Sequence, residues 1–181
     1  MPSADVPVFI YALLLHGLIG GLDVFLNHEL LARLPAQQWS GPEERMHSAR
    51  EWIFFAIFAS LAWFEWHGAA VWWIALLYLG EVLVSARDVV IEGDTRVLPA
   101  PERVLHLFLF MNLGALVVLV GQVLMGWHEM PTGVTPASYG WASWVLSVMA
   151  AGALVWAVRD GISAKKNTVI PAKAGIHTSR D

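Results

Sequence analysis

Residues 88–106, DVVIEGDTRVLPAPERVLH, decide the fold because an earlier stretch of the chain repeats their pattern. The earlier stretch, residues 23–47, reads DVFLNHELLARLPAQQWSGPEERMH. Both contain Asp-Val, an apolar pair, a polar linker with an arginine, Leu-Pro-Ala, and then Pro-Glu followed by an arginine and a histidine. Seven residues before each aspartate stands another ionisable residue, His16 in the first copy and Glu81 in the second. Because long apolar runs flank both copies, the pattern predicts a duplicated unit of two helices.

The composition around these stretches is typical of a membrane protein. The 181 residues are 57% hydrophobic and only 14% charged, whereas soluble domains carry about 25% charged residues. The apolar runs approach the roughly 20 residues that a helix needs to cross a bilayer, and they are continuous rather than alternating, which favours helices over a barrel. The chain has no cysteine, which excludes disulfides, thiolate metal sites and cysteine nucleophiles. No basic patch indicates nucleic acid as a partner.

The apolar runs predict membrane spans at residues 8–26, 52–64, 69–84, 104–125 and 141–158. They predict an all-α polytopic membrane protein whose core, residues 1–126, is a four-helix bundle made from the duplicated two-helix unit. The first repeat covers about 8–67 and the second about 69–126. An outer loop and a fifth transmembrane helix, packed outside the bundle, occupy 127–163. Residues 164–181 are polar and are predicted to be a disordered tail, so that His177 is given no role.

The distribution of basic residues predicts the orientation of the chain. Arginines occur in the linkers after the first and third spans, and Arg159, Lys165 and Lys166 follow the fifth. The other two loops contain no lysine or arginine. We therefore expect the N-terminus outside and the C-terminus in the cytoplasm. The first span lacks the features of a cleaved signal peptide and is expected to be retained.

The ionisable residues within the bundle are the candidate functional residues. His16 and Asp23, like Glu81 and Asp88, are seven apart and share a helix face, as do His47 and Glu51, four apart. Charged residues at a helix centre cost about 2.5–3.5 kcal/mol each in a membrane unless they pair or bind a cation. We therefore expect one or two divalent metal ions near the cytoplasmic side, with ligands drawn from His16, Asp23, His47, Glu51, Glu81, Asp88 and His106.

Histidine with carboxylate and without cysteine is the ligand mixture of iron, manganese or zinc sites. Di-metal carboxylate proteins build such sites inside four-helix bundles from Glu and Glu-x-x-His motifs. Glu44 and His47 have this spacing, but Glu102 and His106 do not. Glu44 and Glu102 are therefore interpreted as acidic residues at helix starts rather than as ligands.

Two other interpretations remain open for the same residues. His47 and His106 are equivalent positions of the repeat and suit the two axial ligands of a haem, the second cofactor considered. In a purely structural interpretation, Asp23 and Asp88 pair with Arg50, Arg87 or Arg103 and no cofactor is bound. Glu65, His67, His128 and Glu129 flank the outer interface and are interpreted as solvated loop residues.

The segments HG-x5-D, NHE, ER-x-HSARE and ERVLH resemble stretches of small, uncharacterised bacterial integral membrane proteins. The resemblance covers roughly the first four spans. It implies a bacterial inner-membrane protein, and no activity comes with it.

Three functions are consistent with these patterns. The first is a metal-dependent membrane enzyme, redox in type, whose lipid or quinone-like substrate enters from the bilayer. The second is a carrier that uses the histidines and carboxylates as a relay for protons or metal ions. The third is a structural or assembly subunit of a membrane complex. A carrier needs polar residues toward the outer face, and the spans offer few there, so the enzyme is ranked above it. The substrate, the metal and the oligomeric state are not fixed by the sequence.

Overall fold

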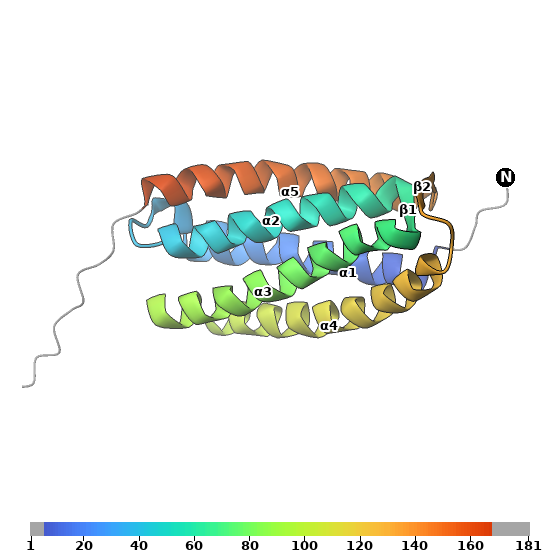
Figure 1. Ribbon diagram of the computed structural model, residues 1–181. Coiled ribbons are helices and arrows are strands. Elements are labelled where there is room, and N and C mark those ends of the chain that lie inside the picture. Colours follow the sequence, from blue (N-terminus) through green and yellow to red (C-terminus); the bar gives the residue numbers. More distant parts are fainter. Residues whose placement is uncertain (1–5, 168–181) are drawn as a thin grey trace, which may run out of the picture.

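The computed structural model describes residues 6–167, and it is mostly helical, as predicted. The long helices run side by side along one axis (Figure 1). In chain order the elements are α1 (Val8–Asp23), η1 (Val24–Leu31), η2 (Leu34–Ala36), α2 (Gly41–Trp63), β1 (Phe64–His67), η3 (Gly68–Ala70), α3 (Val71–Thr95), α4 (Ala100–His128), β2 (Gly133–Pro136) and α5 (Trp141–Lys166).

The helices pack in an order that makes α2 central to one half of the bundle. α2 lies against α5 along its length and also against α3, whereas α1 lies against α4. In Figure 1, α5 and α2 form one side of the molecule, α3 and α4 the other, and α1 lies between them. The fifth helix, which the sequence placed outside a four-helix bundle, is therefore an extensive partner of α2.

A two-stranded ribbon joins the loops at one end of the bundle. The segment after α2 forms β1, which pairs antiparallel with β2. Glu65 pairs with Thr135 and His67 with Gly133. Gly68 has φ +55° and lies so close to Thr132 that a Cβ would collide with its backbone. This contact requires glycine.

The surface of the bundle is apolar while much of its interior is polar. Large side chains such as Leu18, Leu83, Met111 and Val148 are exposed. Among the described residues, four helical segments are long and apolar enough to span a membrane: Val8–Ala36, Gly68–Thr95, Ala100–His128 and Trp141–Lys166. An apolar exterior around buried charges is the arrangement expected in lipid. These features indicate a membrane protein.

The polar linkers are more helical than the sequence predicted. α3 continues through the second linker to Thr95, and α4 begins at Ala100. Pro42 and Pro101 stand in the first turns of α2 and α4, followed by glutamates, as predicted for helix starts. The prediction of a disordered tail from residue 164 is wrong for residues 164–167. Lysines in the last turn suit the C-terminus of α5, and buried Asn167 bonds to Ser163. Residues 168–181 lie outside the described part.

A π-helix follows α1 directly. In η1 the hydrogen bonds span five residues instead of four, and such segments are rare and frequent at functional sites. The Asn27 side chain donates to Asp23 Oδ1 at 2.6 Å. The wider turns bring His28 to the buried side of the segment, where it is 5% exposed. η1 ends before Arg33, which has φ 49° and turns the chain toward η2.

Candidate metal centre

Eight ionisable side chains gather inside the bundle, at the end opposite the β-ribbon. We call them the buried cluster; each helical segment contributes two, a few residues apart: Asp23 and His28 from α1–η1, Glu43 and His47 from α2, Asp88 and Glu92 from α3, and Glu102 and His106 from α4. All eight are buried. Side chains four apart on a helix share a face, so α2, α3 and α4 each present both members inward. Asp23 and His28 are five apart, and the π-helix of η1 brings them to the same side.

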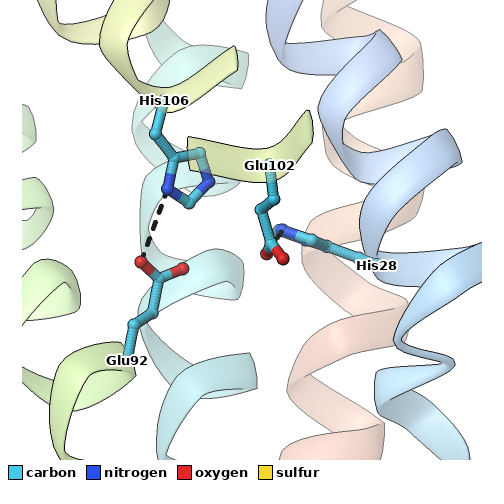
Figure 2. A group of neighbouring side chains, drawn as sticks. All are labelled: His28, Glu92, Glu102 and His106. Atoms are coloured by element: carbon cyan, nitrogen blue, oxygen red, sulfur yellow. Dashed lines mark ion pairs between the residues drawn. The ribbon is translucent and has the colours of Figure 1, made fainter. Parts of the chain in front are cut away.

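One group within the buried cluster has the composition of a metal site. His28, Glu92, Glu102 and His106 each offer an atom, and these atoms all lie within 4.8 Å of one another. Figure 2 shows the four side chains pointing toward one another from η1, α3 and α4. His106 Nδ1 lies 3.5 Å from Glu92 Oε2, and His28 Nε2 lies 3.5 Å from Glu102 Oε1. Two imidazoles and two carboxylates suit iron, manganese or zinc.

A second group shares one of these residues. Glu43, His47 and Glu92 also bring ligand atoms within 4.8 Å of one another. Glu92 Oε1 lies 3.7 Å from His47 Nε2, while Glu92 Oε2 faces His106. One carboxylate thus directs a different oxygen to each group.

Two aspartates support the imidazoles from outside these groups. Asp23 Oδ2 lies 3.0 Å from His106 Nε2, the nitrogen opposite the one that faces Glu92. Asp88 Oδ2 lies 3.5 Å from His47 Nε2. A carboxylate that accepts the second N–H of a ligating histidine fixes its tautomer and orientation. Asp23 occupies this position for His106.

Arg96 contacts both glutamates that begin α2 and α4. Its Nη2 donates to Glu43 Oε1 at 2.6 Å, and its Nη1 donates to Glu102 Oε2 at 2.7 Å. Burial acts to lower the pKa of Arg96, but the hydrogen bonds and negative charges of Glu102 and Glu43 outweigh it and raise the pKa above its usual value. The guanidinium therefore stays charged and would compete with a metal ion for these two carboxylates.

Several buried nitrogens have no hydrogen-bond partner in the described part of the chain. Both ring nitrogens of His28 and of His47 are among them. The two rings stack with centroids 4.2 Å apart and an interplanar angle of 8°. Buried polar atoms are rarely left unpaired, because each costs about 1–3 kcal/mol. Unpartnered imidazole nitrogens beside carboxylates are available to ligate a cation.

The residues singled out from the sequence occupy two regions. His47 and His106 each belong to one of the two groups that could hold a metal ion, with Asp23 and Asp88 beside them. His16, Glu51 and Glu81 belong to neither group. His16 stacks on Phe54 with ring centroids 4.6 Å apart, and Glu81 accepts from Arg50 Nε at 3.1 Å. Glu51 and His16 line a cavity that adjoins the buried cluster.

The sequence analysis missed His28, Glu43, Glu92 and Arg96, and it interpreted Glu102 as a helix-start charge. A signal for two of them was present: Glu43 and His47 are four apart, as are Glu102 and His106. Glu44, whose three-residue spacing to His47 drew attention, instead accepts from Ser163 Oγ at 2.7 Å in the α2–α5 interface. Nothing in the sequence marks the π-helix that positions His28.

The expected pairing of Asp88 with Arg50 is confirmed, whereas Asp23 lies against histidines. Arg50 donates to Asp88 Oδ2 at 3.2 Å and also pairs with Glu81. Of the two outer histidines, His128 is exposed as expected and His67 is not. His67 is buried, 5% exposed, because β1 carries it against Glu65 Oε2 at 3.1 Å and Thr135 at 3.3 Å.

Comparisons of the chain with protein-family models, with curated proteins and with solved structures gave no match. The function is therefore argued from the geometry of the buried cluster.

Proposed function

We propose that the chain is an integral membrane protein that binds two divalent metal ions, iron, manganese or zinc, in the buried cluster. The observation that carries this proposal is the position of Glu92, whose two oxygens face His106 and His47 separately. The first ion would take His28, Glu92, Glu102 and His106, and the second Glu43, His47 and Glu92. Asp88 lies close enough to His47 to complete the second site or to orient its imidazole.

The balance of charge supports cation binding. The buried cluster contains five carboxylates, and the guanidinium groups that contact them are those of Arg96 and Arg50. Arg50 is also shared with Glu81. With neutral imidazoles, at least three negative charges are left uncompensated inside the bundle, and unpaired buried charge is strongly unfavourable. Two divalent ions would offset it.

We further propose that the site arose from a duplicated two-helix unit, about 8–67 and 69–126, as the sequence predicted. Two contacts support this proposal because they are exchanged between the repeats. Asp23 of the first repeat contacts His106 of the second, and Asp88 of the second contacts His47 of the first. Arg96 contacts the two equivalent glutamates, Glu43 and Glu102. Such exchange is expected around an axis relating parallel repeats.

Among metal-dependent functions, an enzyme fits better than a carrier or a haem protein. A carrier requires polar groups along its path, but the half of the bundle toward the β-ribbon has a core of apolar residues including Ile10, Ile57, Leu61 and Leu116. A haem would require a flat space between His47 and His106, and the Glu92 carboxylate lies there. A di-metal centre beside a cavity suits the activation of a bound substrate.

We propose the bacterial inner membrane as its location, with α5 as a fifth span, the N-terminus outside and the C-terminus in the cytoplasm. The arginine and lysine distribution supports this orientation. A reporter fused after Gly68 should be active outside and one at the C-terminus inside. A cytoplasmic signal from the reporter after Gly68 would refute this orientation.

Metal analysis of the detergent-purified protein tests the proposed centre. We expect close to two equivalents of a single transition metal per chain, and about one in His47→Ala, because His47 belongs to only one group. His128→Ala is the matched control, since His128 lies at the β-ribbon end of α4 and contacts the Gly68 carbonyl. Unchanged metal content in His47→Ala, or none in the native protein, would favour a structural role for the paired charges.

A further inference from the structure

A cavity of about 300 Å³ adjoins the buried cluster on one side. Asp23, His28 and His47 line it, so the imidazoles of both metal-binding groups border the same space. The rest of its lining comes from α1, η1, α2, α5 and Leu109 of α4, without any residue from the interhelical loops. Pockets for small molecules begin at about this volume.

Part of the cavity lining consists of residues with little or no side chain. They are Gly17, Gly20 and Gly21 of α1 and Gly152 and Ala153 of α5. The bare backbone leaves a smooth surface. Aromatic and thioether side chains complete the lining: Phe54, Phe58 and Met149. Such walls suit a flat apolar ring, which packs well against aromatic side chains.

Polar atoms without partners lie around the same cavity. Trp156 Nε1, Glu51 Oε2 and His16 Nδ1 are buried and have no hydrogen-bond partner in the described part of the chain. His16 is only 3% exposed. An indole N–H donates only and an ionised carboxylate accepts only. A carbonyl oxygen would satisfy Trp156, and a hydroxyl would satisfy Glu51.

The exposed part of the cavity lining lies on α1 and η1. Phe25, one of its lining residues, is 53% exposed, and Gly21 is exposed beside it. Both belong to a segment long and apolar enough to cross a membrane, as do the α5 lining residues. The opening therefore lies along the length of the bundle, where lipid would surround it, rather than at either end.

We propose that this cavity binds a lipid-soluble ring compound of the quinone or quinol class, which enters from the bilayer between α1 and α5. The ring lies beside the glycines of the lining and Phe54, with one oxygen at Trp156 and its edge toward His28 and His47. In the quinol form, the hydroxyl would donate to Glu51. This inference names a substrate class for the proposed metal centre and rests on that centre for its chemical purpose, although the binding itself uses cavity residues.

Binding of a decyl-substituted para-benzoquinone to the full chain in nanodiscs, measured by titration calorimetry, tests the proposal. Gly152 has open space around its Cβ position, so Gly152→Leu fills the cavity and should weaken binding at least tenfold. Trp156→Phe should weaken it about fivefold, the effect of one lost hydrogen bond. Gly114→Leu is the matched control: Gly114 is exposed on α4, also has open space, and does not line the cavity. It should bind like the native protein.

The proposal is overturned if the native protein does not bind the quinone, or if Gly152→Leu binds it as tightly as Gly114→Leu does. Equal affinity for decylbenzene, which lacks the oxygens, would also overturn it, since the polar atoms would then contribute nothing. The titration is repeated on chelator-treated protein and on His47→Ala. If the native protein binds the quinone but contains no metal, the metal centre is refuted and the cavity assignment stands. If the protein binds two metal ions but no quinone, the cavity assignment is refuted and the metal centre stands.

Discussion

Replacing Arg96 with methionine separates the metal centre from a purely structural cluster of charges. Methionine keeps the apolar length of the side chain but removes the guanidinium that binds Glu43 and Glu102. Both glutamates are fully buried, with 0% of the residue surface exposed. In metal-free Arg96→Met, two carboxylates would remain inside the bundle without their common partner.

The expected change in the free energy of unfolding differs between the metal-free and the metal-loaded variant. Removing one partner of a buried ion pair costs about 3–5 kcal/mol, so the metal-free variant should lose roughly this much stability. A metal ion at about 100 times its dissociation constant returns about 2.7 kcal/mol to the folded state. Because Arg96 no longer competes for Glu43 and Glu102, the variant should bind metal more tightly than the native chain.

Thermal unfolding in detergent, with and without added metal, measures both effects. We expect metal to raise the unfolding temperature of Arg96→Met more than that of the native protein. Arg103→Met is the control, because Arg103 is exposed in the first turn of α4, next to Glu102, and should change neither quantity. Equal metal-induced shifts in Arg96→Met and the native protein would refute competition between the guanidinium and a metal ion.

Three further outcomes follow from neighbouring contacts. Glu43→Gln should lower the metal content, whereas Glu44→Gln should keep the metal and lower only the unfolding temperature. The reason is that Glu44 bonds Ser163 and Asn167 in the α2–α5 interface. Metal analysis and thermal melts of the two variants measure these effects, and reversed effects would contradict the assignment. Asp23→Asn should weaken metal affinity about 10–100-fold in competitive titrations, since it orients His106, and full affinity would exclude that role. Lowering the pH from about 7.5 to about 5.5 should release metal, because ligating imidazoles must be neutral; metal retention after dialysis at the lower pH would argue against histidine ligands.

The sequence predicted the features that depend on composition and helical period. Continuous apolar runs predicted the helices, and prolines followed by glutamates predicted the starts of α2 and α4. His47 and His106 were recognised because they occupy equivalent positions in the repeated pattern. The partners that make them a site were not recognised, for physical reasons. Glu92 and Arg96 lie in a stretch that resembled a polar linker, whereas α3 continues through its first part to Thr95.

The position of His28 could not be derived from regular helical geometry. With 3.6 residues per turn, Asn27 would share a face with Asp23 and His28 would be rotated away from it. The π-helix of η1 changes this relation, and His28 reaches Glu102. Glu43 and Glu44 illustrate a similar limit, because adjacent residues of one type face the metal-binding group and the α5 interface respectively.

Because of the β1–β2 ribbon, the two ends of the bundle should respond differently to salt, acid and chelators. At the ribbon end, main-chain pairing between residues 64–67 and 133–136 ties the loops together, and salt or metal should leave this link largely unaffected. At the opposite end, contacts such as those of Arg96 with Glu43 and Glu102 hold the helices by charge. Chelators, acid or high salt would therefore loosen the bundle from one end only. Amide exchange near Asp23 and Glu92 would quicken while the amides of β1 stayed protected, and the helices would spread apart without losing their alignment.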